Sequence, residues 1–247
     1  MSKLIAGYFV AEMGWLLMRW QGICRHVSKN YNGTIIGCEK EYSFLFKDFA
    51  TEFKYFEDLR IKINSRNMWM SNGTTYPMEK ANFLPSRNVC LENEYHQDFI
   101  KYGHKDASLK YDILIHARST ENYNTGYRNW AVDNWIELSR RLCGLRVASI
   151  GSIGGALHIA GTDDCRGIEL SLLADVMASS TVLLSPSSGP VHFASLCGLR
   201  HIVWATEKDR GIYNNRERYE KLWNPFNTSC VFIPTWQPTI EQVIENL

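Results

Sequence analysis

A run of small polar residues between two apolar segments is the part of this sequence best suited to chemistry. The apolar residues 181–184 predict a buried strand, and residues 191–197 predict a helix that stops at Gly198. Ser187, Ser188 and Gly189 lie between these two elements. A helix N-terminus binds phosphate through its free N–H groups and its positive dipole end, and glycine lets the backbone approach closely. The run predicts a phosphate-binding loop, although an ordinary strand-to-helix turn has the same composition.

Arg118, Arg128 and His192 are further side chains that could contact a bound anion. Arg118 ends a predicted strand and Arg128 stands at the start of a predicted helix. Guanidinium groups bind phosphate through paired hydrogen bonds. His192 lies two residues into the helix after the polar run, where it could bond phosphate or sugar. A solvated position for each arginine and a packing role for His192 are the open alternatives.

Glu12 is the candidate general base of the chain. It lies just after the first predicted strand, at residues 4–10, where a carboxylate could take a proton from a bound hydroxyl group. A charge at a helix N-terminus, favoured by the helix dipole, is the other interpretation of the same residue.

Composition limits the class of protein. The 247 residues are 45% hydrophobic, which is enough for one large domain or two small ones. A net charge of +1 provides no strong field for nucleic acid or membrane. Seven cysteines without a C-x-x-C pair favour reduced thiols and a cytoplasmic location. No apolar run approaches the roughly 20 residues that span a bilayer, so we expect no membrane span.

Alternating strand and helix patterns predict an α/β fold with mainly parallel strands. Strands are expected at residues 4–10, 34–38, 111–116, 146–150, 157–160, 181–184 and 201–205. Helices are expected at residues 15–31, 42–56, 130–142, 168–179, 191–197 and 239–246. We expect one lobe at residues 1–100 and a second at 101–247, with ligands in a cleft at the carboxyl ends of the strands.

The second block resembles the C-terminal nucleotide-sugar-binding domain of GT-B glycosyltransferases, most closely the heptosyltransferase-like family, over residues 111–235. In that family a strand ends in Asn-Asp-Ser-Gly-Pro-Met-His before a helix. The sequence here reads Pro186-Ser187-Ser188-Gly189-Pro190-Val191-His192. The upstream order is also similar to that of the family. It consists of a strand with a basic end, a helix after Arg128 and a Gly/Ser loop.

The first block resembles the first strand–helix turn of related GT-B enzymes through residues 11–22, where an acidic residue faces the acceptor. Two positions depart from the family pattern. Ser187 replaces the acid of the small-residue run, and Trp15 stands where an acid often follows the loop glycine. Glu12 is the nearest remaining carboxylate.

The resemblance implies two Rossmann-like lobes of GT-B type, with a reduced N-terminal acceptor-side lobe. It implies a glycosyltransferase that moves a sugar from a nucleotide-sugar donor to a hydroxyl acceptor. Glu12 would be the base. The residues expected at the donor are Arg118, Arg128, Ser152, Ser187, Ser188, Gly189 and His192. The acceptor stays open between a surface glycan, a modified nucleobase and a protein side chain.

The sequence offers no metal-binding pattern for such a transfer. Many sugar transferases hold a metal ion through Asp-x-Asp, which this chain lacks, and no His/Cys cluster has zinc spacing. Asp163 and Asp164 fit a solvated turn better than a nucleoside contact. We therefore expect metal-independent chemistry without a cofactor, in which helix N–H groups and arginines stabilise the diphosphate.

Two other functions are compatible with the same residues. One is another nucleotide- or phosphate-binding transferase, for instance a pyruvyl-transferase-like enzyme. The other is a non-catalytic binding protein on a decayed transferase fold, which the changes at Trp15 and Ser187 favour. Binding of a nucleoside diphosphate to the second block would distinguish the glycosyltransferase from the pyruvyl-transferase-like enzyme. Hydrolysis of a nucleotide sugar would distinguish it from the non-catalytic binding protein.

Overall fold

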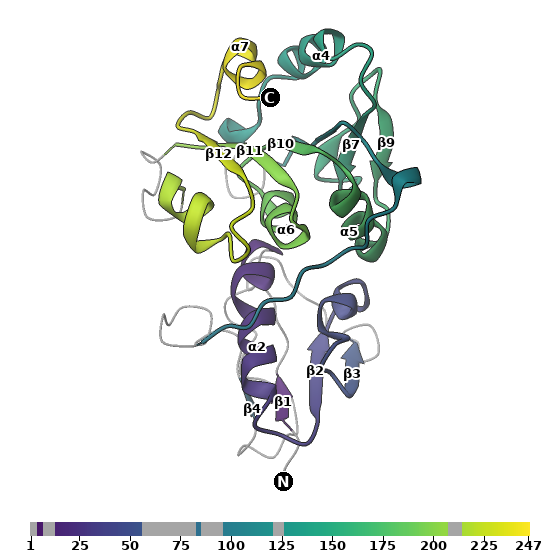
Figure 1. The fold of residues 1–247 in the computed structure, drawn as a ribbon, viewed down its shortest axis with the longest axis vertical. Coiled ribbons are helices and arrows are strands. Elements are labelled where there is room, and N and C mark those ends of the chain that lie inside the picture. The colour runs from purple at the N-terminus through teal and green to yellow at the C-terminus, as the bar shows by residue number, and fades with distance from the viewer. Residues whose placement is uncertain (1–3, 7–12, 56–82, 85–95, 121–125, 207–213) are drawn as a thin grey trace. The chain divides into compact units, whose positions relative to one another are not determined.

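The computed structural model describes residues 4–6, 13–55, 83–84, 96–120, 126–206 and 214–247 (Figure 1). The chain divides into two compact units, Met1–Phe99 and Ile100–Leu247. Each unit contains a sheet in which neighbouring strands are parallel. The prediction of an α/β fold with mainly parallel strands is therefore confirmed.

The first unit contains a four-stranded sheet of order β3-β2-β1-β4. Its strands are β1 (Leu4–Ala6), β2 (Thr34–Cys38), β3 (Glu52–Tyr55) and β4 (Phe83–Leu84). The helix expected at 15–31 is present as α1 (Met13–Trp15), a π-helical turn (Leu16–Trp20) and α2 (Gln21–Ser28). Leu17, Trp20 and Ile23 are fully buried, so an apolar face holds these helical segments in the unit.

The prediction of a helix over residues 42–56 is wrong. Lys40–Phe46 forms a 3-10 helix, and Glu52–Tyr55 forms the edge strand β3, which pairs with β2. Aromatic residues favour strands as well as packed helices. Phe53 and Tyr55 are two positions apart, and their rings stack with centroids 5.9 Å apart. That two-residue period is typical of a strand and indicates a strand rather than a helix here.

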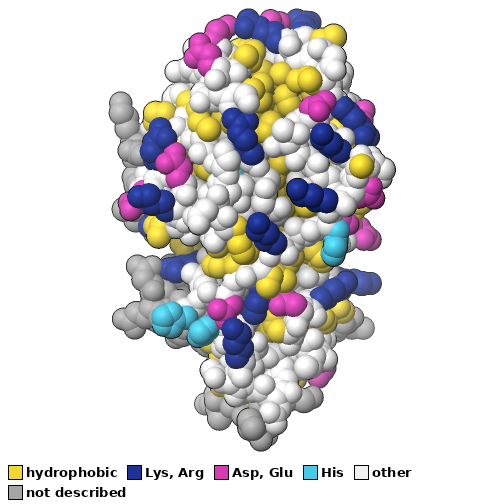
Figure 2. Space-filling model, in the orientation of Figure 1, with side chains coloured by type: hydrophobic (Ala, Val, Ile, Leu, Met, Phe, Trp, Pro, Cys, Tyr) yellow, Lys and Arg dark blue, Asp and Glu magenta, His cyan; other side chains and the backbone are white. Residues whose placement is uncertain are grey.

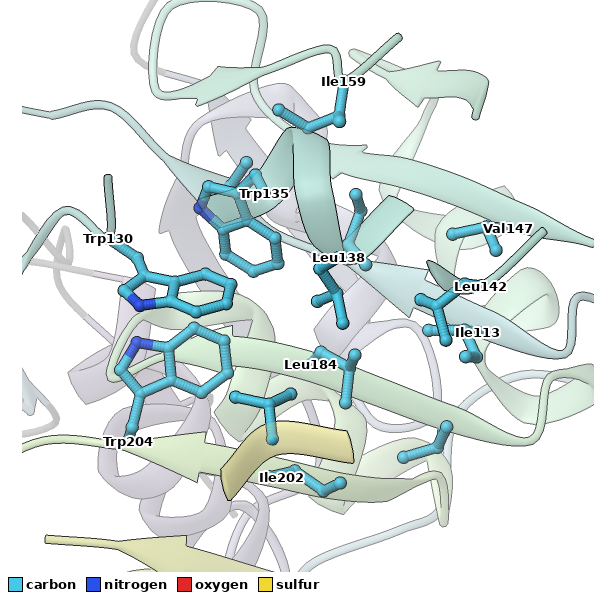
Figure 3. Packing of buried hydrophobic residues seen from close by; sticks show 14 of the residues in the cluster. Ile113, Trp130, Trp135, Leu138, Leu142, Val147, Ile159, Leu184, Ile202 and Trp204 are labelled. Carbon is cyan, nitrogen blue, oxygen red and sulfur yellow. The ribbon is translucent and has the colours of Figure 1, made fainter. Parts of the chain in front are cut away.

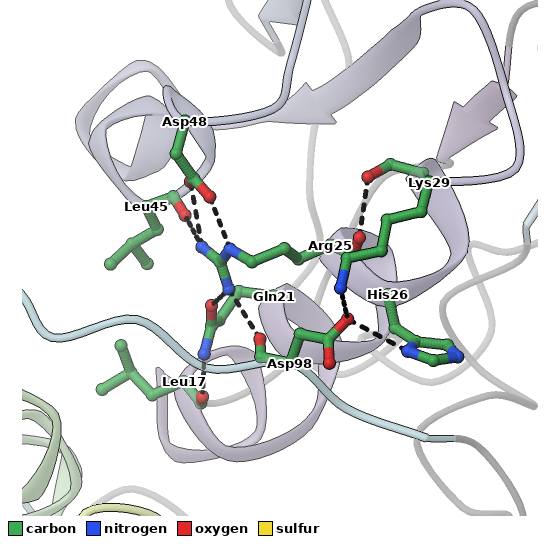
Figure 4. A network of polar contacts seen from close by, with 9 residues as sticks. Leu17, Gln21, Arg25, His26, Lys29, Leu45, Asp48 and Asp98 are labelled. Carbon is green, nitrogen blue, oxygen red and sulfur yellow. Dashed lines mark hydrogen bonds and ion pairs between the residues drawn. The ribbon is translucent and has the colours of Figure 1, made fainter.

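A buried arginine joins three parts of the first unit (Figure 4). Arg25 on α2 donates from Nε to Asp48 Oδ2 at 2.6 Å and from Nη2 to Asp48 Oδ1 at 3.0 Å. It also donates to the carbonyl oxygens of Leu45 and Asp98, at 3.0 and 2.9 Å, and to the side chain of Gln21. A buried charge is tolerated only when it is paired and fully hydrogen-bonded, and Arg25 meets this condition.

The second unit contains a six-stranded sheet of order β12-β11-β10-β5-β7-β9. Its strands are β5 (Ile113–Ile115), β7 (Val147–Gly151), β9 (Asp163–Arg166), β10 (Val182–Pro186), β11 (Arg200–Trp204) and β12 (Cys230–Ile233). Its helices are α4 (Val132–Arg141), α5 (Leu170–Ser179), α6 (Gly189–Cys197) and α7 (Ile240–Ile244). Figure 1 shows α4 and α7 on one face of this sheet and α5 and α6 on the other.

Shorter elements complete the second unit. β6 (Ala117–Arg118) and β8 (Ala156–Leu157) form a separate antiparallel pair. Ala107–Leu109 and Gly126–Arg128 are 3-10 helices, and Arg218–Leu222 is a π-helical segment.

None of the helices in the described ranges is both long and apolar enough to cross a membrane. On the face drawn in Figure 2, Lys and Arg side chains are interspersed with Asp and Glu.

Asp163 and Asp164 are exposed to solvent, as expected, but the prediction that they form a turn is wrong. Both residues belong to the edge strand β9, which pairs with β7 in parallel. Edge strands often carry charged side chains because one side faces solvent. Asp164 pairs with Arg166, with Nε 2.8 Å from Oδ1, and this ion pair lowers the pKa of the carboxyl group. Asp163 Oδ2 lies 3.9 Å from Nε of Arg146, so the two aspartates pair with different arginines.

Three tryptophans lie at the centre of the core on the α4 side of the second sheet (Figure 3). The rings of Trp130, Trp135 and Trp204 contact one another, with centroids 4.9 to 5.5 Å apart. Trp130 Nε1 donates to the carbonyl of Pro238 at 2.9 Å, so the buried indole keeps a polar partner. Trp204 ends β11, and its contact with Trp130 therefore fixes residues 128–130 next to the carboxyl end of the sheet.

Candidate functional site

The candidate site lies at the carboxyl ends of three neighbouring strands. β10 pairs in parallel with β5 on one side and with β11 on the other, so the three strands end at the same edge. His116 follows β5 and its backbone N–H donates to the carbonyl of Leu184 at 3.0 Å. Ser187 follows β10 and its N–H donates to the carbonyl of Trp204 at 2.9 Å. Ligands of open α/β sheets bind at such an edge.

Helix α6 begins directly after this edge. Ser188 has an extended backbone, Gly189 is the first helical residue, and a proline stands in the first turn. The side chain of Ser188 does not cap the helix. The helix is nine residues long and leaves the half-buried Ser188 and Gly189 at its positive dipole end. This arrangement fits an anion in place of a side-chain cap.

Ser188 belongs to a cluster of three side chains. Its Oγ lies 3.1 Å from His116 Nδ1 and 3.0 Å from Ser185 Oγ. Ser185 Oγ donates to the carbonyl of Pro186 at 2.7 Å and lies 3.3 Å from the same Nδ1. The pKa of His116 is lowered to about 3, mainly by burial and to a smaller extent by the charge of Arg118. The imidazole is therefore neutral and takes part in hydrogen bonds in either direction.

Ser187 faces a different set of partners. Its Oγ donates to Asn214 Oδ1 at 2.9 Å and is hydrogen-bonded to the hydroxyl of Tyr219. Both partners are buried, and burial raises the pKa of Tyr219. At the position where the resembled family has an acid, this chain has a neutral network of a serine, an amide and a phenol.

His192 packs against the aromatic residues of the π-helical segment and its C-terminal end. Its ring stacks on Tyr219 with centroids 5.6 Å apart and meets Trp223 edge to face at 4.9 Å. Within the described part of the chain its buried Nδ1 has no hydrogen-bond partner. Burial lowers the pKa of His192 to about 3, with His201 as a smaller cause. The structure therefore places a neutral ring behind the loop.

The two arginines lie on neighbouring segments that are joined by a hydrogen bond. Arg118 ends β6 and donates from Nη1 to the carbonyl of Thr120 at 2.8 Å and to the side chain of Asn129. Arg128 lies between two aromatic rings, with Cζ 5.7 Å from the Tyr127 centroid and 5.2 Å from that of Trp236.

Arg128 keeps unused hydrogen-bonding capacity. Its Nε is buried and has no partner among the residues that the structure describes. Cation–π contacts hold a guanidinium group without neutralising it. Arg128 is therefore a half-buried cation that two aromatic rings hold in place.

The other predicted site residues have different outcomes. Ser152 is exposed in the loop after β7, next to β5 in the sheet, and its carbonyl accepts from the N–H groups of Gly155 and Ala156, each at 3.1 Å. Glu12 lies outside the described residues. No group of three or more His, Cys, Asp or Glu within the described ranges is arranged to hold a metal ion.

The sequence prediction missed His116, Ser185 and the partners of Ser187. A signal existed for the first of these, because His116 is a polar residue at the end of an apolar run that was expected to be a strand. Ser185 directly precedes the loop, and its contact with His116 appears only in the folded chain. Tyr219 is a buried residue without a local motif, and only the folded chain brings it to the loop.

Solved structures of other proteins have a similar fold. No protein-family model matches the chain, and no curated protein sequence matches it. E. coli heptosyltransferase WaaC with ADP is similar at a TM-score of 0.61 and 11% identity, over 100% of this chain and 98% of the other. E. coli ADP-heptose LPS heptosyltransferase II is similar at 0.63 and 11%, over 99% and 97%.

A glycosyltransferase of family 9 from Veillonella parvula is similar at a TM-score of 0.56 and 9% identity, over 99% of this chain and 95% of the other. The chain therefore has the fold of the heptosyltransferases. The GT-B-type, heptosyltransferase-like fold that the sequence resemblance implied is confirmed.

Buried imidazoles make the stability of the second unit depend on pH. The pKa values of His116 and His192 fall from 6.5 to about 3 on folding, and that of His201 is lowered by burial. Between about pH 3 and pH 6.5, His116 and His192 bind protons in the unfolded chain but not in the folded chain. Stability is therefore expected to fall as the pH drops below about 6.5.

His192→Phe tests this linkage because phenylalanine keeps the ring contacts but cannot bind a proton. The free energy of unfolding, measured with urea from about pH 7.5 to about pH 5, should fall less steeply in the variant, by up to about 1.4 kcal/mol per pH unit. His104→Gln is the control, since the side chain of His104 is 98% exposed. An unchanged slope in His192→Phe would show that His192 is protonated in the folded protein.

Proposed function

We propose that this protein is a glycosyltransferase that moves a sugar from a nucleotide-sugar donor to a hydroxyl acceptor. The observation that carries the proposal is the turn through Ser188 and Gly189 at the start of α6, at the carboxyl edge of the sheet. It occurs in a fold shared with a heptosyltransferase whose structure contains ADP. We place the donor's diphosphate at this turn.

The proposed site stabilises the leaving diphosphate with fixed positive groups. As the sugar leaves, negative charge develops on the diphosphate, and preorganised donors lower the barrier most effectively. The positive end of α6 and the guanidinium of Arg128 supply such groups. Arg118 and Ser152 lie after β5 and β7, at the same edge of the sheet, and we propose that they complete the donor site.

Ser187 and His192 support the loop in this proposal. Ser187 is hydrogen-bonded to Asn214 and Tyr219, and His192 stacks on the same tyrosine. Both residues therefore connect the turn to the π-helical segment and hold its backbone in place. A fixed backbone lets an anion bind without rearrangement.

Metal independence and the identity of the base are also part of the proposal. Arginine and helix N–H groups would take the place of a metal ion, and no cofactor besides the nucleotide sugar would be required. Glu12 would take the proton of the acceptor hydroxyl. A glycan acceptor follows from the family resemblance, and a nucleobase or protein acceptor remains compatible with the same chemistry.

A thermal-shift screen in EDTA tests the donor class. ADP, UDP, GDP, CDP and dTDP would each be added either with EDTA or with Mg²⁺ and Mn²⁺. We expect at least one to raise the melting temperature equally in both conditions, because a ligand at 100 times its Kd stabilises by about 2.7 kcal/mol. A shift that needs Mg²⁺ or Mn²⁺ would overturn metal independence. The absence of any shift would overturn the donor site.

Gly189→Val tests the position of the diphosphate. A branched side chain at the first residue of α6 would occupy the space in which an anion approaches the backbone. We expect affinity for the diphosphate to fall at least about tenfold, measured by calorimetry, with an unchanged circular dichroism spectrum. Leu172→Val is the matched control, because Leu172 is 41% exposed and lies in the first turn of α5. Unaltered binding by Gly189→Val would show that the loop is only a turn.

Glu12→Gln tests the base. Glutamine keeps the shape of the side chain but cannot accept the proton, so the rate at saturating donor and acceptor should fall about 10²- to 10⁴-fold, while donor affinity stays the same. Glu41→Gln, an exposed carboxylate of the same unit, is the control. Nearly normal turnover in Glu12→Gln would assign Glu12 to the helix dipole instead.

A further inference from the structure

We propose that His116 is a positioning residue of the donor site, which directs the hydroxyl proton of Ser188 toward an anion bound at the start of α6. The inference rests on the proposed function and adds a residue to it. It is carried by the geometry of His116, Ser185 and Ser188, whose polar atoms lie within 3.3 Å of one another.

The imidazole ring of His116 is held rigidly. The side chain is buried, and the backbone N–H is fixed to the carbonyl of Leu184. Gly151 has a φ of 123°, and a Cβ atom at this glycine would lie 2.7 Å from Cδ2 and 3.0 Å from Nε2 of the ring. Any larger residue at position 151 would displace the imidazole, so the glycine lets β7 pack closely against it.

The hydrogen atoms of the cluster can be counted. Ser185 and Ser188 have one hydroxyl proton each, and both oxygens lie within reach of the carbonyl of Pro186, at 2.7 and 3.0 Å. The shorter contact assigns the proton of Ser185 to that carbonyl. The proton of Ser188 can then point to Pro186, to Ser185, to His116 Nδ1 or to a ligand.

The tautomer of His116 decides among these directions. If Nδ1 is unprotonated it accepts the proton of Ser188, and the hydroxyl presents only lone pairs to the site. If Nδ1 carries the proton it donates to Ser188 Oγ, and the hydroxyl proton is free to point at a phosphate oxygen. A neutral imidazole has both tautomers available, so ligand binding can select the second.

The selected arrangement is a chain of hydrogen bonds from Nδ1–H through Ser188 Oγ–H to the anion. Hydrogen bonds to charged acceptors are shorter and stronger than neutral ones, and successive bonds polarise one another. His116 therefore contributes to anion binding without contacting the ligand.

Calorimetry with ADP and adenosine tests the inference. The variants are His116→Leu, His116→Asn, Ser188→Ala and the double variant His116→Leu/Ser188→Ala. We expect His116→Leu and Ser188→Ala each to weaken ADP binding about tenfold, and the double variant to bind no more weakly than Ser188→Ala. Adenosine, which has no phosphate, should bind equally to all of them.

His116→Asn provides the rescue, because its amide can donate or accept close to the position of Nδ1. It should keep ADP affinity near that of the wild type and stay informative if His116→Leu does not fold. In the wild type, the ¹⁵N chemical shifts of the imidazole should show a protonated Nδ1 in the ADP complex. His104→Leu, at an exposed position, should leave ADP affinity unchanged.

Several results would overturn the inference. They are parallel losses of ADP and adenosine affinity, additive effects in the double variant, no rescue by asparagine, or an unprotonated Nδ1 in the complex. Wild-type protein that binds none of the five nucleoside diphosphates would instead overturn the proposed function, and this inference with it. The two failures are therefore distinguishable.

Discussion

The parallel pairing of β10 with β5 and β11 is the constraint on which the rest of the second unit depends. Parallel strands must all end at the same edge, so residues that follow different strands become neighbours there. His116 and Ser188 are 72 positions apart in the chain and form a hydrogen bond because of this pairing. The start of α6 is fixed at the same edge, since β10 leads into it through two residues.

The residues around this edge are neutral where they are buried and cationic where they are more exposed. Burial keeps the imidazoles of His116 and His192 uncharged, and Ser187 is hydrogen-bonded to an amide and a phenol. Arg118 and Arg128 remain partly exposed. An anion bound here would meet positive charge without a competing buried carboxylate at Ser187, the position where the resembled family has an acid.

Apolar runs and helix starts were predictable from the sequence, and edge elements were not. The runs at 34–38 and 181–184 became β2 and β10 because burial on both faces requires continuous apolar sequence. β3, β9 and β12 each pair with only one strand, and their polar or short sequences could have belonged to a turn or a helix. Ser188 and Gly189 were recognisable as the start of a helix. Ser185 and Tyr219 were not, because their roles come from contacts with residues 69 and 32 positions away.

The tryptophan core and the arginine site are parts of one packed assembly. Trp130 packs on Trp204 at the end of β11 and donates to the carbonyl of Pro238. Arg128 stands two residues before Trp130, and Trp236 stands two residues before Pro238. Arg128 and Trp236 contact each other as cation and ring. Because the indole and the guanidinium group are carried by the same short segments, loosening the core would also release the cation. Burial of large aromatic side chains is strongly favourable, so packing on the rings of Tyr127 and Trp236 holds Arg128 in position. A cation held in this way keeps its full attraction for a phosphate group.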